Sequence, residues 1–418
     1  MGLEEDTMEP PAEGAPHGGA RAREAPGYRA AGVDLEGKRA LVQQLARIAR
    51  TTPQAGVLQG IGGFAGALAL ADAAGAFEDP VLVAGADGVG TKLELLARLG
   101  RHRVAGVDCV AMCVNDVVAA GGRPLFFLDY LAMSRLDPEV ASEVVEGVAE
   151  GCREAGCTLL GGETAEMPGF YGAGMYELAG FCVGVADRAA IERGMMARPG
   201  DVLVGLGSSG LHSNGFSLVR RILEQAGADL GAPAPFGQGP GAPPGTSTLR
   251  EHGSLGERSV PPPPGITLGE ALTQPTRIYA RAALAMGAAV EVHALAHITG
   301  GGLPDNLSRV LPAGTRAVVE RGSWPEPAVF RWLEETGRLS ETEMFRVFNM
   351  GLGMVAAVAP ADVEAAVALA TAAGHAAWVV GRVEGPGLDP ATTLSRGIRF
   401  TASAKQAQTG GWVEIVGR

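Results

Sequence analysis

The chain has 418 residues, of which 46% are hydrophobic and 19% are charged, a balance typical of folded globular proteins and not of disordered ones. This length predicts two or three domains, because single cores rarely grow beyond roughly 250 residues. The formal net charge of −12 argues against binding nucleic acid through its phosphates, and no apolar run reaches the ~18 residues of a membrane span. An anionic ligand must therefore be bound by local amides, metal ions and a few selected cations.

Five cysteines lie in apolar stretches without any Cys-x-x-Cys pair. Reduced, buried thiols are typical of cytoplasmic proteins, and we expect this chain in the cytoplasm. Residues 1–27 are rich in Gly, Pro, Glu, Ala and Arg and lack the apolar segment of a signal peptide. We expect them to form a disordered tail.

Residues 28–187 have the pattern of a first domain that alternates helices and strands. Its best-marked element is a helix with Asp137 as N-cap, Pro138 at the first position and Gly156 at the end. The other expected elements are helices at 38–50 and 108–120, a glycine-rich loop at 54–68, and strands at 81–85, 125–128, 157–160 and 181–185.

Residues 188–384 form an expected second domain, interrupted by a Pro/Gly-rich insertion at 231–266 that cannot pack a core. Residues 385–418 are expected to form a loop and a closing strand at 412–416. Because both halves mix helices and strands, the fold class is α+β or α/β. The expected elements of the second domain are strands at 202–206, 316–320, 354–358 and 377–380, and helices at 215–226, 277–288 and 361–373.

The segment Gly161-Gly162-Glu163-Thr164-Ala165-Glu166-Met167-Pro168-Gly169 directly follows one of these predicted strands. Glycine and proline allow a sharp turn, and two carboxylates, Glu163 and Glu166, lie within it. A strand that ends in a glycine-rich turn carrying acids suits a site for a cation, or for a phosphate bound through one. The alternative is a solvated turn.

Asp87-Gly88-Val89-Gly90-Thr91-Lys92 combines a strand end, an acid, a flexible turn and a cation. It is not a P-loop, because Thr91 separates Gly90 from Lys92 and breaks the required order. Asp87 can bind Mg²⁺, the turn amides can bind phosphate oxygens, and Lys92 can neutralise one. A hairpin turn with an exposed salt bridge is the alternative.

Asn115 and Asp116 are adjacent polar residues on an otherwise apolar predicted helix. Burying an unpaired carboxylate is costly, so the two side chains need a partner. A metal ion or a nucleotide would supply it, and a backbone N–H elsewhere would do so equally well.

His212-Ser213-Asn214-Gly215 lies between a predicted strand and a helix start, where backbone amides point outward. A histidine there can transfer a proton or contact a phosphate. Capping of the helix by Ser213 or Asn214 is the alternative.

His293 and His297 have the i, i+4 spacing of a zinc-binding helix but lack the glutamate of HExxH. The glycines of Thr299-Gly300-Gly301-Gly302 favour a second anion-binding turn instead. Two other glycine patterns, Gly60–Ala65 and Gly205–Gly210, resemble dinucleotide-binding loops. Neither lies in a complete βαβ unit, so a nicotinamide site is disfavoured.

Taken in chain order, these segments resemble the aminoimidazole ribonucleotide (AIR) synthetase family, the phosphoribosylformylglycinamidine cyclo-ligases. The wider superfamily of ATP-using enzymes carries D-x4-G-A-x-P, which here reads Asp116-x4-Gly121-Gly122-Arg123-Pro124 with glycine in place of alanine. The resemblance extends from about Tyr28 to Val383 around the insertion. The stretches that carry it are Ala31 to Asp34, Gly60 to Phe64, Asp87 to Lys92, Val110 to Asp116, Pro124 to Tyr130, Gly161 to Gly169, Gly207 to Gly215, His297 to Gly302 and Phe345 to Gly351.

The resemblance implies a two-domain AIR synthetase-like fold. Its N-terminal, ATP-binding domain would combine strands with those of a second subunit in the shared β-barrel of a homodimer, and its C-terminal α/β domain would pack outside. ATP would lie along a glycine-rich loop and the acid-bearing turns near the subunit boundary.

The reaction implied is a step of de novo purine biosynthesis, in which formylglycinamidine ribonucleotide and ATP give 5-aminoimidazole ribonucleotide, ADP and phosphate. Transfer of the γ-phosphoryl group to the formamide oxygen makes a leaving group, and such transfer needs mainly positioning and charge neutralisation. The implied site residues are Asp87, Asp116 and Glu163 for Mg²⁺; Gly60, Gly62, Gly63, Asp87, Lys92, Asn115 and Asp116 for ATP; His212, His297 and Lys92 for catalysis; and Ser213, Asn214, Thr299, Gly300 and Gly301 for the substrate. The separate roles of His212 and His297 stay open.

Two other classes of function remain. One is a different ATP-using member of the same superfamily, such as a thiamine-phosphate kinase or a selenophosphate synthase, and the other is a non-catalytic scaffold. The matches at Gly161–Gly169 and Phe345–Gly351, and the lack of a suitably placed reactive cysteine, favour the cyclo-ligase. A scaffold has no need for all of Asp87, Asp116, Glu163 and His212 together.

Overall fold

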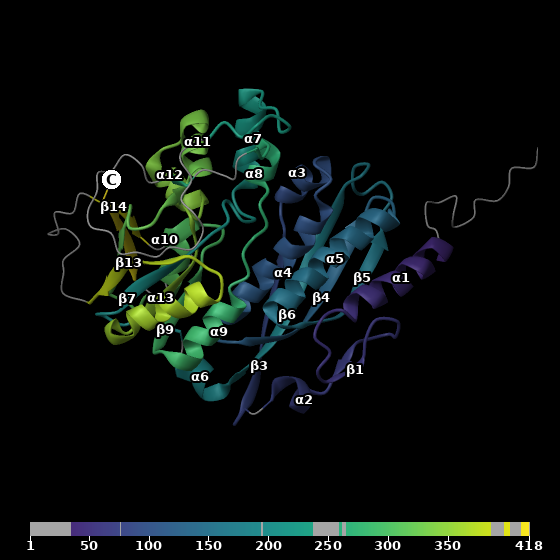
Figure 1. The fold of residues 1–418 in the computed structure, drawn as a ribbon, viewed down its shortest axis with the longest axis horizontal. Coiled ribbons are helices and arrows are strands. Elements are labelled where there is room, and N and C mark those ends of the chain that lie inside the picture. The colour runs from purple at the N-terminus through teal and green to yellow at the C-terminus, as the bar shows by residue number, and fades with distance from the viewer. Residues whose placement is uncertain are drawn as a thin grey trace, which may run out of the picture.

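A computed structural model of the chain describes residues 35–75, 77–193, 195–236, 259–260, 265–385, 397–401 and 411–417. These residues form two α/β units, each built on its own mixed sheet (Figure 1). The tail expected at 1–27 lies outside the described residues, as do most of the insertion expected at 231–266 and most of the loop expected after 385.

The N-terminal unit contains a four-stranded sheet in the order β3-β6-β4-β5. Its neighbours are antiparallel except β4 and β5, which are parallel and are joined by the crossover helix that such a pair requires. In a single chain the described strands form an open sheet and no closed barrel. The elements of this unit are α1 (Leu35–Ala49), β1 (Val57–Gln59), β2 (Ala67–Leu68), α2 (Leu70–Ala74), β3 (Pro80–Gly88), α3 (Lys92–Arg98), α4 (His102–Ala119), β4 (Arg123–Met133), α5 (Pro138–Ala155), β5 (Thr158–Glu166), β6 (Tyr176–Asp187) and α6 (Arg188–Arg193).

The crossover helix α5 has the ends that its sequence predicts. Asp137 accepts hydrogen bonds from the N–H groups of Glu139 and Val140, and Pro138 is the first helical residue. Gly156 ends the helix in the left-handed conformation, with φ of 77°, which glycine adopts without steric cost.

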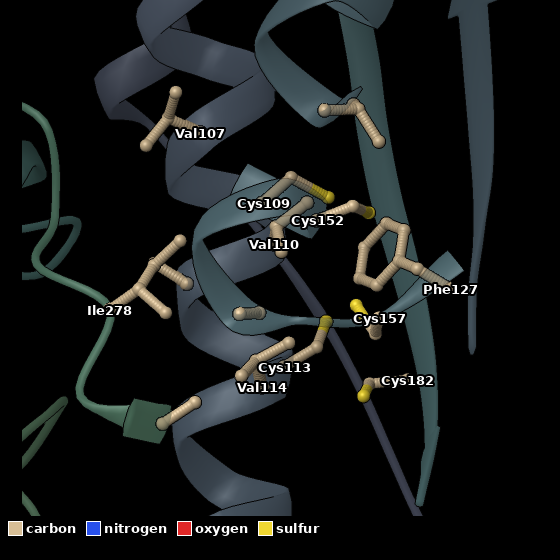
Figure 2. Close-up of a cluster of buried hydrophobic side chains, with 14 of the residues drawn as sticks. Val107, Cys109, Val110, Cys113, Val114, Phe127, Cys152, Cys157, Cys182 and Ile278 are labelled. Carbon is tan, nitrogen blue, oxygen red and sulfur yellow. The ribbon is translucent and has the colours of Figure 1, made fainter. Parts of the chain in front are cut away.

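Helices α4 and α5 pack on one face of this sheet, and the apolar core between the helices and the sheet contains all five cysteines (Figure 2). The thiols are free and buried, as the sequence predicted. Burial raises the pKa of Cys152 and of Cys182, so these side chains stay protonated at neutral pH and pack as small apolar groups.

The opposite face of the same sheet carries exposed apolar side chains. Leu82 on β3, Phe181 on β6 and Tyr130 on β4 are 64%, 45% and 37% exposed. Exposed large apolar residues that share a face are typical of an interaction surface.

The C-terminal unit is built on a seven-stranded sheet in the order β14-β15-β10-β13-β7-β12-β9. All neighbours are antiparallel except β10 and β15. Its elements are β7 (Val202–Gly207), α7 (Phe216–Ala226), β8 (Ser259–Val260), α8 (Leu268–Leu272), α9 (Ala280–Ala289), β9 (Val292–His297), α10 (Gly302–Leu307), η1 (Ser308–Val310), β10 (Arg316–Glu320), β11 (Glu326–Pro327), α11 (Ala328–Gly337), α12 (Glu341–Val347), β12 (Leu352–Val358), η2 (Pro360–Asp362), α13 (Val363–Ala372), β13 (Ala377–Glu384), β14 (Ile398–Thr401) and β15 (Trp412–Val416).

One apolar cluster spans both units, and a second one lies mostly within the C-terminal unit. The cluster under α4 and α5 continues through Ile278 and the buried face of α9 into Leu295 and Met354 on the C-terminal sheet. Figure 1 shows α4 and α9 beside each other where the blue N-terminal part meets the green C-terminal part. The boundary between the units is therefore packed, and side chains on α4 can reach residues of both.

The turn predicted to begin at Gly161 is wrong. β5 continues through this segment to Glu166, paired in parallel with β4. Gly162 is needed for close packing, because a Cβ atom there would lie 2.2 Å from Asp129 Oδ1 on the neighbouring strand. The glycine thus marks a place where a buried carboxylate fills the space of a side chain.

Candidate active site

Three side chains from three elements meet at the boundary between the units. Asp87 lies near the end of β3, Asp116 on α4 and His297 at the end of β9. His297 Nδ1 is 2.8 Å from Asp116 Oδ1, and both residues act electrostatically on Asp87. β3 and α4 are packed against each other here, since a Cβ atom on Gly85 would be in ordinary van der Waals contact with α4, 3.8 Å from Asp116 Cβ.

The two carboxylates of this cluster have different surroundings. Burial raises the pKa of Asp87, and the negative charge of Asp116 adds to that rise against the hydrogen bond from Gly88 N–H and the effect of His297. The Asp116 side chain is 52% exposed. A cation between two such carboxylates would relieve their repulsion, so the chemistry of the pair suits a divalent metal ion.

Asn115, predicted to contact ATP, is fully buried and joins the two units. Its Nδ2 donates to the carbonyl of Arg277 at 2.9 Å and its Oδ1 accepts from Tyr279 N–H at 2.8 Å. The same Nδ2 lies 3.4 Å from His297 Nε2, which fits a tautomer in which Nε2 accepts and Nδ1–H donates to Asp116. Asn115 therefore holds the imidazole of His297 in place, and its contact with ATP stays a prediction.

His212 is buried in a strained conformation beside this cluster. Its φ of 59° lies in the left-handed region, which is uncommon outside glycine and occurs often at functional sites. Burial lowers the pKa of His212 well below its usual value, and His297 and Lys92 lower it further. The imidazole is therefore neutral at pH 7.

The hydrogen bonds of His212 define what it can do. Ser209 N–H donates to Nε2 at 3.3 Å, so the neutral ring carries its hydrogen on Nδ1. His212 Nδ1 and Asn214 Nδ2 are both buried without a hydrogen-bond partner among the described residues. Unmet donors inside a protein are costly, and a ligand with acceptor oxygens would satisfy both.

The turn at Thr299–Gly301 adjoins the His212 loop, as the predicted substrate site requires. A Cβ atom on Gly300 would be 3.4 Å from Asn214 Oδ1. Asn306 holds this turn, since its Nδ2 donates to the carbonyls of Thr299, Gly300 and Gly302 at 3.2, 3.3 and 2.7 Å.

Glu163 and the glycine-rich loop are not brought to this cluster within one chain. Cross-strand pairing places Asp87, Gly180, Asp129 and Gly162 in one row on the helix-covered face, so Glu163 belongs to the opposite face. Its described ion pair is with Lys38, at 3.3 Å. Its role as a metal ligand stays a prediction.

Gly60, Gly62 and Gly63 lie in the connection between β1 and β2, beside the fully exposed Phe64. Among the described residues, none of the hydrogen bonds or ion pairs joins this loop to Asp87 or Asp116. The contact of these glycines with ATP stays a prediction.

Lys92, predicted as a counter-charge for phosphate, is the first residue of α3 and is fully buried. Its Nζ is 2.7 Å from Asp108 Oδ2 and donates to the carbonyl of Gln274, also at 2.7 Å. Sequence reasoning missed Asp108, which precedes Asn115 by seven residues and so shares its face of α4. A second polar residue on that face of an apolar helix was the signal that could have found it.

A surface hollow of about 560 Å³ lies at the N-terminal end of α5, lined by residues such as Ser134, Asp137 and Met175, and none of the predicted site residues borders it. Within the described part of the chain, no group of three or more His, Cys, Asp or Glu side chains is arranged to hold a metal ion. We define the site by the unmet donors and paired carboxylates, since these require a ligand on chemical grounds.

Comparison with known families agrees with this geometry. Residues 71–186 match the N-terminal domain, and residues 198–389 the C-terminal domain, of the AIR synthase related proteins. The two sheets and the boundary site therefore define a protein of the AIR synthase related class.

The curated relatives are more specific. The phosphoribosylformylglycinamidine cyclo-ligase of Anaeromyxobacter sp. (strain Fw109-5) is 50% identical over 358 residues, which covers 85% of this chain and 95% of the relative. That of Myxococcus xanthus (strain DK1622) is 48% identical over 357 residues, with the same shares. The chain belongs to the phosphoribosylformylglycinamidine cyclo-ligase family.

Solved structures resemble the chain in fold. A thiamine-monophosphate kinase from Stenotrophomonas maltophilia K279a has a TM-score of 0.55 at 19% identity and covers 84% of this chain and 96% of its own. The hydrogenase maturation protein HypE in complex with ATP has a TM-score of 0.55 at 16% identity, over 84% of this chain and 87% of its own.

In the described residues, none of the helices is long and apolar enough to cross a membrane.

Proposed function

We propose that this chain closes the imidazole ring of a purine precursor, converting formylglycinamidine ribonucleotide and ATP into 5-aminoimidazole ribonucleotide, ADP and phosphate. The observation that carries the proposal is the meeting of Asp87, Asp116 and His297 beside the unmet donors of the His212 loop. Family membership at about 50% identity over most of the chain supports the same reaction. This identity to cyclo-ligases also favours that reaction over the thiamine-phosphate kinase alternative, because the chain resembles the solved kinase only in fold.

The chemistry requires two bond exchanges. The formamide oxygen attacks the γ-phosphorus and ADP leaves, and an amidine nitrogen then attacks the formyl carbon while phosphate departs with the former formamide oxygen. Ring closure also removes two hydrogens from the substrate, one of them from the attacking nitrogen; one protonates the departing phosphate and the other is released as a proton. Both steps depend mainly on positioning of the reacting groups and neutralisation of charge, and less on covalent catalysis by the protein.

Asp87 and Asp116 are the residues that would hold Mg²⁺. Magnesium in nucleotide sites is usually bound through one or two carboxylates together with substrate phosphates, so two carboxylates at this boundary fit the ion. Bound there, Mg²⁺ would neutralise charge on the phosphate oxygens. Glu163 remains a third candidate that must first leave Lys38.

His212 and His297 take different roles in this proposal. His212, neutral and with its hydrogen on Nδ1, donates a hydrogen bond to a substrate oxygen. His297 donates through Nδ1 to Asp116, so its Nε2, next to Asn115, carries no hydrogen and is the better acceptor for a proton released on ring closure. Ser213, Asn214 and the turn from Thr299 to Gly301 would surround the substrate.

The same proposal includes a homodimer in the cytoplasm. The exposed apolar face formed by Leu82, Tyr130 and Phe181 suits packing against the same face of a second subunit, which would complete a barrel from two open sheets. Five buried free thiols suit a reducing compartment.

The test is turnover by the purified protein. With both substrates and Mg²⁺, we expect ADP and 5-aminoimidazole ribonucleotide in equal amounts, and neither product when formylglycinamidine ribonucleotide is omitted. ADP release without this substrate, or phosphorylation of thiamine monophosphate in its place, would contradict the proposal.

A further inference from the structure

Lys92 and Asp108 form an ion pair whose two side chains are both 0% exposed. Burial lowers the pKa of Lys92 and raises that of Asp108, and their mutual attraction opposes both changes. The desolvation of such a pair often offsets its Coulomb energy, so a buried ion pair is weak evidence for a gain in stability. The question is what geometry the pair fixes.

Both charged groups also bind one segment of the C-terminal unit. Lys92 Nζ donates to the carbonyl of Gln274 at 2.7 Å, and Asp108 Oδ1 accepts from Thr276 N–H at 2.7 Å. Further along the same face of α4, Asn115 binds the backbone of Arg277 and Tyr279. We call residues 273–279, between α8 and α9, the interdomain strap.

The interdomain strap in turn holds the loop that carries His212. Ser209 Oγ donates to the carbonyl of Pro275 at 2.5 Å, and the hydroxyls of Thr276 and Ser213 lie 3.1 Å apart. Tyr279 OH donates to the carbonyl of Gly207 at 2.9 Å. The loop from 207 to 216 is thus attached at three points to a segment that the N-terminal unit fixes.

We propose that Lys92 and Asp108 are positioning residues that set the His212 loop against the Asp87–Asp116–His297 cluster, and that Lys92 does not bind phosphate. This inference rests on the proposed function. A phosphate could reach Lys92 Nζ only by displacing Asp108 and the Gln274 carbonyl from a fully buried site. Fixing the loop matters because a misplacement of about 1 Å at a reacting centre can cost about 10²-fold in rate.

The test is the double substitution Lys92→Met/Asp108→Asn, which removes both charges together and so leaves no unpaired buried ion. The new amide at position 108 can still accept from Thr276 N–H, while a methionine at position 92 cannot donate to Gln274. We expect the KM for formylglycinamidine ribonucleotide to rise at least about tenfold and kcat to fall by about 10- to 100-fold, as for misplaced reacting groups. The KM for ATP should change less than about twofold, because the hydrogen bonds of Asp87 and Asp116 that involve a side chain go, in the described part of the chain, to Gly88, Cys113 and His297 and not to the strap.

A control is Arg316→Met/Glu414→Gln, which removes another buried ion pair, with side chains 8% and 3% exposed, from the C-terminal sheet. Glu384, the second partner of Arg316, keeps its ion pair with Arg382 in this variant. We expect this variant to lose thermal stability while both KM values stay the same. A folded Lys92→Met/Asp108→Asn enzyme with an unchanged KM for formylglycinamidine ribonucleotide would overturn the inference. A KM for ATP that rises as much as or more than that of the other substrate would overturn it too, because it would mean direct contact with the nucleotide.

Thr276→Val decides the matter if the double variant does not fold. It removes the hydroxyl that lies next to Ser213 and also interacts with Asp108, and it keeps the N–H bound by Asp108. We expect a rise of about three- to tenfold in the KM for formylglycinamidine ribonucleotide, the size of one lost hydrogen bond, and no rise would count against the inference.

Hydrogen exchange separates a failure of the inference from a failure of the proposed function. In Lys92→Met/Asp108→Asn, or in Thr276→Val, we expect faster exchange in residues 207–216 and 273–279 and unchanged exchange in β10. Unchanged exchange in 207–216 would overturn the inference whether or not the wild-type protein turns over. Absence of wild-type turnover would overturn the proposed reaction alone.

Discussion

Asp116 and Glu163 were both predicted to bind Mg²⁺, and the structure gives them different neighbours. Asp116 adjoins Asp87 and His297 at the boundary of the two units, whereas Glu163 lies on the other face of the N-terminal sheet beside Lys38. Side chains along β5 alternate between the two faces of the sheet. Because the segment was interpreted as a turn, the sequence could not show that Glu163 lies on the face away from Asp87. The acid in the helix was identifiable because its surroundings in the sequence are apolar.

We expect Asp116→Asn to lower kcat by about 10²- to 10³-fold, the usual loss when a group that stabilises developing charge is removed. Because the amide that replaces the carboxylate can still accept from His297 and the side chain is half exposed, the fold should be retained. The Mg²⁺ concentration for half-maximal rate should rise as well. Steady-state kinetics against Mg²⁺ measures both effects.

Glu163→Gln is the paired variant for this experiment. If Glu163 binds no metal in the working enzyme, its Mg²⁺ dependence should equal that of the wild type. A loss like that of Asp116→Asn would show that Glu163 does reach the metal, and would place the site differently from the cluster described above.

His375 should make stability depend on pH. Burial lowers its pKa to about 4, so the folded protein binds fewer protons than the unfolded chain between pH 4 and the usual value of about 6.5. Stability therefore falls as the pH drops through this window, with a slope of up to about 1.4 kcal/mol per pH unit from this one group. We expect His375→Gln to lose about that slope in urea unfolding between pH 6.5 and 4.5, and equal slopes in the two proteins would contradict the assignment.

At the scale of elements, the sequence was most informative where local signals act alone. The helix beginning at Pro138 and the strands at 316–320 and 412–416 were predicted with their observed limits. By contrast, β9 was noticed only as a pair of histidines, and Gly161 was taken as the start of a turn. The glycine at position 162 is required because the Asp129 carboxylate on β4 occupies the space of a side chain, and no local sequence pattern encodes that contact.

Two adjacent glycines in β5 test this explanation. A Cβ atom on Gly162 would lie 2.2 Å from Asp129 Oδ1, whereas one on Gly161 would find its nearest neighbour, the flexible end of Leu128, at 3.5 Å. We expect Gly162→Ala to reduce the free energy of unfolding by about 1–3 kcal/mol, as overpacking does, and Gly161→Ala to change it by less than about 1 kcal/mol. Equal values from denaturant unfolding would show that Gly162 does not serve the packing of Asp129.

At the scale of the whole molecule, the two-domain organisation and the family were predictable because many motifs follow one order along the chain. The burial of Lys92 was not, since its partners Gln274 and Asp108 are brought to it by the packing of α3, α4 and the interdomain strap. A turn that contains a lysine gives no sign of a segment about 180 residues away. The position of a charged side chain that depends on distant partners could therefore not be predicted from the sequence.

We expect a dimer because one face of the N-terminal sheet exposes large apolar side chains. Phe181→Glu places a charge on this face, and we expect the protein to sediment as a monomer, because burying an unpaired charge in an interface is costly. Val379→Glu is the control, since Val379 on β13 is similarly exposed, 47% against 45%, and lies outside that face. A dimer of unchanged stability in Phe181→Glu would exclude this face as the interface.

The fate of the formamide oxygen tests the proposed chemistry most directly. Formylglycinamidine ribonucleotide labelled with ¹⁸O in the formyl group should yield phosphate that carries one ¹⁸O atom, because the oxygen receives the γ-phosphoryl group and departs with it. Mass spectrometry of the released phosphate would detect the transfer. Unlabelled phosphate, formed together with ADP and 5-aminoimidazole ribonucleotide, would mean that ATP is hydrolysed apart from ring closure and would contradict phosphoryl transfer at this site.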